Sequence, residues 1–281
     1  MKNKLLVILS VLLCNVLLFS LYGCAGKTPE ITENTVEVKT EGGLPLSDIG
    51  IFIYKDESHS ELVWAGNTGK DGKASFSAPI PEKCVAVLKD VPDGYAVSED
   101  YSVTAGLTEI SLETVIEEGD ISSLQLKRGS VMKDFTVKSV SGTEYRLSEL
   151  LEEKKAVVLN FWFLNCQPCK MEFPHMEAAY GNYKESIEIL AMNPVDGTNE
   201  EILNFADTNG LTFPMTKCSE DWAKAFDLTA YPTTVVIDRY GVICFIHKGT
   251  IPETETFEKI FSYFTADDYT QKIITDINDI Q

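Results

Sequence analysis

Short segments of alternating apolar and polar residues fill the chain from residue 34 to residue 114. Successive side chains of a strand point to opposite faces, so this alternation is typical of strands with one buried face. Turn signals rich in Gly, Asp and Pro separate the segments, and no helical period is present. Residues 34–114 are therefore predicted to form a small β-sandwich. The expected strands are TVEVKT, IGIFIYKD, ELVWAG, KASFSA, CVAVLKD, YAVSEDYSVT and TEISLET.

The pattern changes near residue 129, after a polar connection at residues 115–128. The run AVVLNFWFL is continuously β-branched and aromatic, which is typical of a strand buried on both faces. Strand-like and helical segments then alternate as far as residue 265. This order predicts an α/β layer in which helices flank a mixed sheet. Residues 266–281 are expected to be a C-terminal tail.

Residues 1–23 have the pattern of an export signal, with the basic lead MKNK and an apolar run from Leu5 to Leu21. The run ends at LYGC, which resembles the lipobox of bacterial lipoproteins. That resemblance implies cleavage before Cys24 and a lipid on its sulfur. An uncleaved membrane anchor is the alternative. Residues 24–33 would then be a polar tether, and the body of the protein would be extracytoplasmic, lipid-anchored to the bacterial cell membrane, where disulfides persist.

Acidic residues outnumber basic ones, 43 to 24, for a net charge of −19. The acidic positions are spread along the chain, which indicates a solvated surface. Such a surface repels nucleic acid, so no nucleic-acid partner is expected.

The candidate reactive residues are Cys166 and Cys169, which follow the buried strand at the start of a predicted helix. A helix N-terminus and a partner thiol can lower a cysteine pKa from about 8.5 by a unit or more. An i, i+3 spacing on a helix also places two sulfurs within bonding reach. We predict that Cys166 is the attacking thiolate and that Cys169 resolves the mixed disulfide.

The segment NFWFLNCQPCKMEFP resembles the active-site segment of thioredoxin-fold proteins, specifically the extracytoplasmic TlpA/ResA-like disulfide reductases. The opening MKDFTVKSVSGTEYRLSELL is similar to the N-terminal extension of redoxin domains. AYPTTVVID resembles the cis-proline strand of the family. The resemblance implies a thioredoxin fold over residues 129–265, a cis bond at Pro232, and a substrate strand aligned by Tyr231 and Pro232.

Glu172 lies three positions past the second cysteine and matches an acidic residue that handles protons in this branch. A carboxylate there could accept the proton of Cys169. The alternative is that Glu172 is a solvated helix residue. Asn165 stands where most members have Trp, so the resemblance does not carry a substrate identity with it.

The resemblance implies a membrane-anchored thiol–disulfide oxidoreductase that reduces exported proteins with cysteine pairs. A membrane electron donor would recharge it, because an oxidising exterior otherwise keeps the pair as a disulfide. One alternative is a peroxiredoxin-type peroxidase, which needs a Thr where this chain has Phe163. Another is a surface adhesion or scaffold protein with an accessory redox domain. No cofactor or metal is expected, because the chain has only 3 histidines and no second C-x-x-C.

The layout VEVKTEGGLPLSDIGIFIY, TGKDGKASF and VPDGY resembles the Cna-B-type, prealbumin-like modules of bacterial surface proteins. Many such modules carry a Lys–Asn isopeptide bond that needs a nearby acid, but CVAVLKD has no Glu at the expected place. We expect no cross-link and a spacer or docking role. Cys84 is expected to be inert, Cys244 to be a buried small hydrophobe, and Cys218 is a candidate for an auxiliary disulfide.

Overall fold

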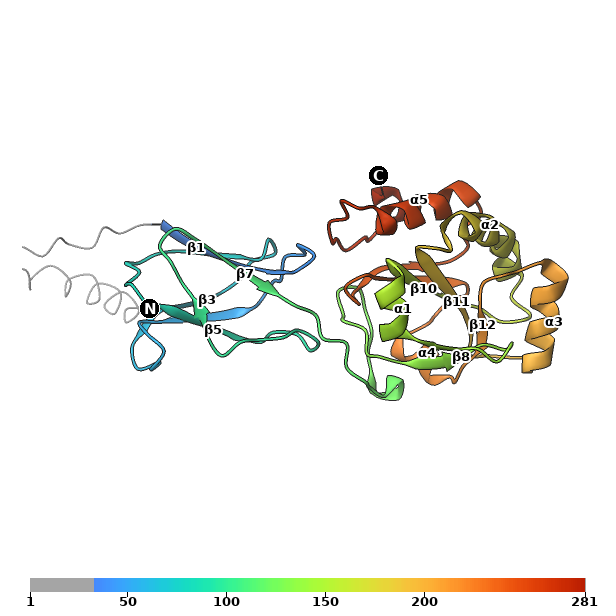
Figure 1. The fold of residues 1–281 in the computed structure, drawn as a ribbon, viewed down its shortest axis with the longest axis horizontal. Coiled ribbons are helices and arrows are strands. Elements are labelled where there is room, and N and C mark those ends of the chain that lie inside the picture. The colour runs from blue at the N-terminus through green and yellow to red at the C-terminus, as the bar shows by residue number, and fades with distance from the viewer. Residues whose placement is uncertain (1–32, 281) are drawn as a thin grey trace, which may run out of the picture. The chain divides into compact units, whose positions relative to one another are not determined.

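The computed structural model describes residues 33–280 (Figure 1). The predicted signal, the lipid attachment at Cys24 and nearly all of the tether lie outside the described residues. Within residues 33–280, no helix is both long and apolar enough to cross a membrane.

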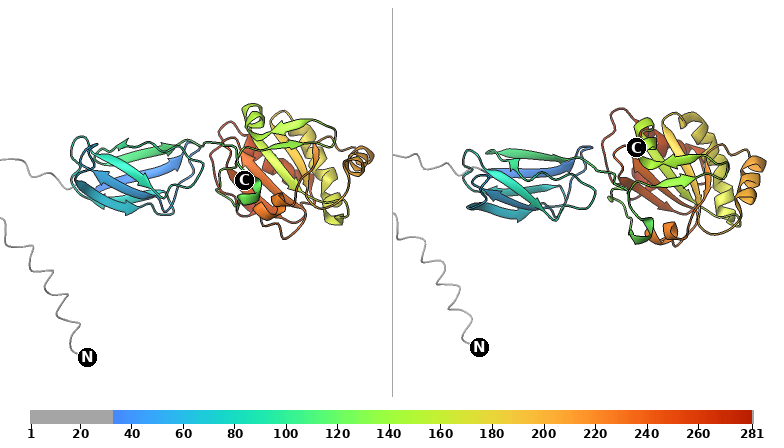
Figure 2. Two further views of the ribbon diagram at one scale, coloured as in Figure 1. Left: turned by 90° about the horizontal axis from the view of Figure 1, so that it is seen from below. Right: turned by 60° about the horizontal axis from the view of Figure 1, so that its bottom comes forward.

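Residues 33–112 form two β-sheets, whose layers are visible in the right view of Figure 2. Buried and exposed positions alternate along β1 (Glu33–Thr40), as its sequence predicts. In one sheet β1 lies between an antiparallel β4 and a parallel β7, and the other sheet has the order β3-β2-β5-β6. The remaining strands are β2 (Gly50–Tyr54), β3 (Leu62–Asn67), β4 (Lys73–Ser77), β5 (Val85–Lys89), β6 (Tyr101–Ser102) and β7 (Leu107–Leu112).

The second half of the chain is built on a five-stranded mixed sheet of order β12-β11-β10-β13-β14. The central strand β10 (Ala156–Phe161) is buried at every residue, as the continuous apolar run predicts. It pairs in parallel with β11 (Ile187–Asn193) and antiparallel with β13 (Thr233–Asp238). The edge strands are β12 (Met215–Lys217) and β14 (Ile243–Lys248).

Helices cover both faces of this sheet. Helices α2 (Gln167–Tyr183) and α5 (Thr254–Thr265) contact each other and pack on the face that includes Val158 and Val236. The opposite face, with Val157 and Leu159, is covered by α1, α4 and residues of the β8–β9 segment. This arrangement confirms the predicted α/β thioredoxin fold. The other elements here are β8 (Thr136–Lys138), β9 (Glu144–Arg146), α1 (Leu147–Glu153), α3 (Asn199–Asn209) and α4 (Asp221–Ala225).

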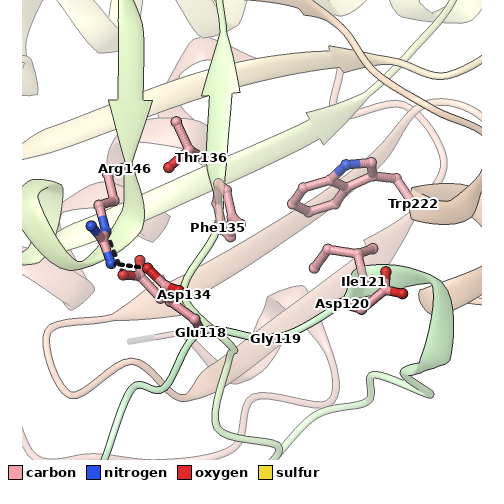
Figure 3. Close-up of a pocket in the computed structure, with 9 residues that line it drawn as sticks. All are labelled: Glu118, Gly119, Asp120, Ile121, Asp134, Phe135, Thr136, Arg146 and Trp222. Carbon is pink, nitrogen blue, oxygen red and sulfur yellow. Dashed lines mark hydrogen bonds and ion pairs between the residues drawn. The ribbon is translucent and has the colours of Figure 1, made fainter.

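The polar connection at residues 115–128 also contacts this α/β layer. Leu126 is buried, and its N–H donates to the carbonyl of Ala225 at 2.7 Å. Residues of the connection line a pocket of about 330 Å³ whose other wall includes Trp222 and Phe135 (Figure 3). At this pocket Arg146 forms ion pairs with Asp134 and Glu118. The connection also contains the short 3₁₀ helix Ile121–Ser123.

Residues 266–280 supply hydrogen-bond donors to a buried carboxylate. Tyr269 Oη and Gln271 Nε2 donate to Asp238 Oδ2 at 2.9 and 2.7 Å. Cys244 Sγ donates to the same oxygen at 3.3 Å, so Cys244 is a hydrogen-bonding residue as well as the small core residue we predicted. Burial raises the pKa of Asp238 despite these donors. The segment ends in a second 3₁₀ helix, Ile277–Asp279.

Helix α5 provides a test of core packing. Phe257 is fully buried, with its ring 5.8 Å from that of Phe261, so Phe257→Ala should lower the free energy of unfolding by about 3–5 kcal/mol. Lys259→Ala on the exposed side of the same helix should change it by less than about 0.5 kcal/mol. Urea unfolding followed by circular dichroism measures both, and equal losses in the two variants would contradict the packing described.

Candidate active site

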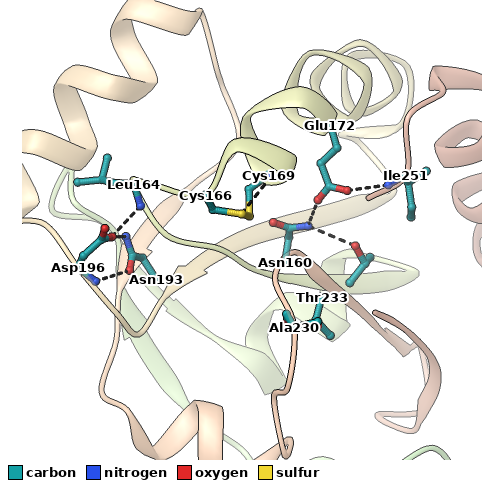
Figure 4. Close-up of a disulfide and its surroundings, with 11 residues drawn as sticks. Asn160, Leu164, Cys166, Cys169, Glu172, Asn193, Asp196, Ala230, Thr233 and Ile251 are labelled. Atoms are coloured by element: carbon teal, nitrogen blue, oxygen red, sulfur yellow. Dashed lines mark hydrogen bonds between the residues drawn. A yellow bond between two sulfur atoms is a disulfide. The ribbon is translucent and has the colours of Figure 1, made fainter. Parts of the chain in front are cut away.

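Cys166 and Cys169 are joined by a disulfide with a Cα–Cα separation of 5.3 Å (Figure 4). Cys166 is the N-cap of α2, and its Sγ accepts the backbone N–H of Cys169 at 3.2 Å. Pro168 falls within the first two positions of the helix, where its missing N–H costs no helical bond. Cys166 is 3% exposed and Cys169 is fully buried, so the pair lies just beneath a rim of exposed residues.

The position of Cys166 favours a thiolate once the disulfide is reduced. The free N–H groups of the first turn point toward the N-cap, and the partial positive charge of the helix end favours an anion there. The Cys169 N–H that contacts Cys166 Sγ is a donor that would stabilise the charged sulfur directly. Cys169 lies inside the first turn, where it is shielded from solvent.

Glu172 is fully buried one turn further along α2. Its Oε1 accepts from Asn160 Nδ2 at 2.8 Å, and its Oε2 accepts the N–H of Ile251 at 2.9 Å (Figure 4). Burial raises the pKa of this carboxyl to about 7, because the two donors only partly replace lost hydration. The alternative interpretation of Glu172 as a solvated helix residue is therefore wrong.

Asn160 connects Glu172 to the neighbouring strand β13. Its Nδ2 also donates to Thr234 Oγ1 at 3.2 Å, while its Oδ1 has no hydrogen-bond partner within residues 33–280. Because residue 160 is an amide, the carboxyl of Glu172 is the ionisable group among these three side chains. The polar layer behind the cysteine pair is thus a carboxyl, an amide and a hydroxyl.

The Tyr231–Pro232 peptide bond is cis, the geometry that the sequence predicts. The turn is closed by Thr233 Oγ1, which donates to the carbonyl of Ala230 at 2.9 Å. Tyr231 reaches the segment before Cys166, since its ring lies perpendicular to that of Phe163 at a centroid distance of 5.3 Å. The structure thus brings the proline loop and the cysteine loop together.

A groove of about 430 Å³ begins at Tyr231 and was not predicted from the sequence. Its apolar lining includes Val195, which is 54% exposed. The remaining lining residues are Pro194, Glu220, Ala223, Lys224, Asp227 and Leu228.

The other described cysteines are free thiols, and Cys218 lies close to this site, where its N–H donates to the carbonyl of Asn193 at 3.0 Å. Cys218 is a half-buried free thiol, and burial raises its pKa to about 12. Cys84 is a buried free thiol in the sandwich, and His175 Nδ1 lies 3.1 Å from the hydroxyl of Thr254. Among residues 33–280, no three His, Cys, Asp or Glu side chains are grouped so that they could hold a metal ion.

Sequence reasoning also missed Asp196, which contacts the segment just before Cys166. A signal for it was present. Strands β10 and β11 are parallel neighbours, so their carboxyl ends meet at one edge of the sheet. Polar residues after β11, such as Asn193 and Asp196, are therefore placed near residues that follow β10.

Comparisons with known proteins find relatives of the α/β half of the chain. Residues 129–246 match the model of the AhpC/TSA family. The thioredoxin-like protein YneN of Bacillus subtilis is 33% identical over 137 residues, which cover 48% of this chain and 79% of YneN. The thiol-disulfide oxidoreductase ResA of Geobacillus kaustophilus is 37% identical over 129 residues, covering 45% of this chain and 72% of ResA.

A solved structure, a thiol:disulfide interchange protein DsbE of Chlorobium tepidum described as putative, superposes with a TM-score of 0.45 at 24% identity. The match covers 50% of this chain and 99% of that one. The fold, the cysteine pair and the sequence relatives define a thiol–disulfide oxidoreductase. The chain belongs to the ResA-like thiol–disulfide oxidoreductases, and the AhpC/TSA match is confined to residues 129–246.

Proposed function

We propose that the protein reduces disulfides in exported proteins through Cys166 and Cys169. The observation that carries this proposal is the disulfide at the start of α2, with Cys166 Sγ on the N–H of Cys169. A buried carboxyl whose pKa is about 7 lies behind the pair, and a cis-proline loop lies beside it. In this proposal the three features serve as nucleophile, proton acceptor and substrate platform.

The reduced enzyme begins with the Cys166 thiolate attacking one sulfur of a substrate disulfide. The substrate S–S bond breaks, a Cys166–substrate disulfide forms, and the leaving sulfur departs as a thiolate that takes a proton. Cys169 then loses its proton and attacks Cys166 Sγ. This step re-forms the Cys166–Cys169 disulfide and releases the second substrate thiolate, so two electrons pass from the enzyme to the substrate.

Glu172 is the proposed acceptor of the Cys169 proton. The two residues are three positions apart on α2, both are fully buried, and a carboxyl with a pKa of about 7 exists in both protonation states near neutrality. Asn160 and the Ile251 N–H hold the carboxyl in place.

The substrate backbone is proposed to align on Tyr231 and Pro232. The cis bond directly precedes β13, so an extended substrate peptide can add to the backbone at that point as a short strand. The ring contact between Tyr231 and Phe163 brings this platform to the loop that carries Cys166.

We further propose that the enzyme works outside the cytoplasm, attached to the cell membrane through a lipid on Cys24. The supporting observations are the basic lead, the apolar run and LYGC at the start of the chain. A membrane-bound dithiol donor would return two electrons to the Cys166–Cys169 disulfide after each cycle.

The test is a Cys169→Ser variant expressed in cells with its natural leader. Without the resolving thiol the mixed disulfide on Cys166 persists, so exported proteins with paired cysteines should be recovered covalently bound to the variant. A Cys166→Ser, Cys169→Ser variant is the matched control and should recover none. Recovery of the same proteins by both variants, or of none by the single variant, would refute reduction of exported proteins.

A further inference from the structure

The loop that follows β11 holds the segment that leads into Cys166. Asp196 Oδ1 accepts the backbone N–H of Leu164 at 2.7 Å (Figure 4). Its Oδ2 accepts from Asn165 Nδ2 at 3.1 Å. One carboxylate therefore contacts both residues that immediately precede the nucleophile. Hydrogen bonds to an ionised acceptor are stronger than neutral ones, which makes this a firm attachment.

Asp196 is itself held in place by Asn193, which is fully buried at the end of β11. Asn193 Oδ1 accepts the N–H groups of Val195 and Asp196 at 3.0 and 3.1 Å, and its Nδ2 lies 3.3 Å from Asp196 Oδ1. Because the amide fixes the turn, the carboxylate is oriented independently of the cysteine loop. Asp196 is thus held by a residue of the central sheet, and it holds the cysteine loop in turn.

The next residue, Gly197, allows the two loops to approach closely. Its φ is +80°, and a Cβ at this position would collide with the side chain of Leu164. The side chain of Leu164 therefore packs against Gly197, whose backbone conformation only glycine adopts without strain. The cysteine loop is closed on its other side by Cys166, whose N–H donates to the carbonyl of Phe163 at 3.0 Å.

We propose that Asp196 is a positioning residue for thiol–disulfide exchange, holding Cys166 Sγ at the start of α2 through its bonds to Leu164 and Asn165. This inference rests on the proposed function of Cys166. Asp196 fixes the two residues before the N-cap, and this restricts where the sulfur can move relative to the Cys169 N–H. Misplacement of a reacting atom by about 1 Å can lower the rate by about 10²-fold.

The charge of Asp196 acts in the opposite sense to its hydrogen bonds. A carboxylate near Cys166 disfavours the thiolate, whereas holding the sulfur on the helix N-terminus favours it. The variant Asp196→Asn separates the two contributions. It keeps an oxygen for the Leu164 N–H, and its amide can donate to a rotated Asn165 side chain, but it removes the charge.

The experiment uses the full chain, reduced and freed of reductant, and follows its reaction with oxidised glutathione and with insulin. The parent chain is measured first, and failure of the parent to react would refute the proposed function rather than this inference. Asp196→Ala should slow the reaction with both disulfides about tenfold. Asp196→Asn should stay within about twofold of the parent. Asp207→Ala, which removes an exposed carboxylate from α3, is the matched control and should leave the rates unchanged.

The pH profile of Cys166 alkylation separates positioning from a general loss of structure. Asp196→Ala should move its midpoint upward, because the sulfur is held less well at the helix end, whereas Asp196→Asn should not raise it. If Asp196→Ala does not fold, the exposed Asn165→Ala removes one of the two bonds and should lower the glutathione rate about twofold to threefold.

Three results would overturn the inference. Asp196→Ala could react with glutathione as fast as the parent. Asp196→Asn could lose as much rate as Asp196→Ala, which would assign the effect to charge. Insulin reduction alone could fall, which would make Asp196 a substrate contact instead.

Discussion

Cys166→Ser should abolish the reduction of insulin, lowering the rate by about 10³-fold or more. Serine retains the size and N-cap geometry of the residue, but its hydroxyl does not ionise near neutrality and forms no disulfide. Loss of a nucleophile has effects of this size or larger in other enzymes. The turbidity of reduced insulin, followed with dithiothreitol as the electron source, measures the change.

Cys218→Ser is the matched control for this variant. Cys218 is a half-buried free thiol whose pKa is raised by burial, so it should stay protonated and take no part in exchange. Insulin reduction by Cys218→Ser should equal that of the parent. If activity survived in Cys166→Ser and disappeared in Cys218→Ser, the nucleophile would be Cys218 and not Cys166.

Glu172→Gln should slow insulin reduction at pH 7 about 10²-fold, the lower end of what a positioned proton acceptor contributes. Glutamine keeps the volume of the side chain and can accept the Ile251 N–H. A rotated Asn160 amide can accept from its Nε2, which would also give the unpartnered Oδ1 a donor. The variant therefore removes the proton acceptor while keeping a hydrogen bond between residues 160 and 172.

The pH profile gives the second measurement on this variant. The parent rate should rise with pH through an inflection near 7, where burial places the pKa of Glu172, and Glu172→Gln should lack that inflection. An unchanged inflection in the variant would assign the titration to another group. A variant rate equal to that of the parent would exclude Glu172 from proton transfer.

The free energy of unfolding should also depend on the titration of the Glu172 carboxyl. The pKa of Glu172 is raised from 4.5 to about 7 on folding, so the native state holds a proton between those pH values that the unfolded chain has lost. Unfolding free energy then falls as pH rises through this window, by about 3 kcal/mol in total for this group. The fall should be smaller in Glu172→Gln by about this amount, as measured by urea unfolding at pH 4.5 and pH 8; the part that remains comes from other buried carboxyls such as Asp238, whose pKa burial also raises.

Much of the site followed from local sequence. The continuous apolar run predicted β10, and its place before two cysteines predicted a disulfide at a helix start, because strand, cap and helix are contiguous in the chain. The segment around Pro232 predicted the cis bond by resemblance. The expected strand YAVSEDYSVT is less extensive than predicted, since only Tyr101–Ser102 forms a strand and Tyr95 makes an isolated bridge to Thr114.

Other features depended on residues that are distant in sequence. The environment of Glu172 needs Asn160 from β10 and the N–H of Ile251 from the turn before α5, 79 positions away. Likewise, Asp196 reaches the cysteine loop across 32 positions to Leu164. No local pattern marks such pairs, because their contact is set by the order of strands in the sheet.

The sequence by itself determined the order of the elements, the buried central strand and the pair of thiols at a helix N-terminus, since periodicity and capping act over a few neighbouring residues. The tertiary structure alone decided that Glu172 is buried with a pKa near 7, that Tyr231 meets Phe163, and that Asp196 holds the cysteine loop. Desolvation and hydrogen bonding depend on what packs around a group, and those neighbours come from segments that only folding brings together.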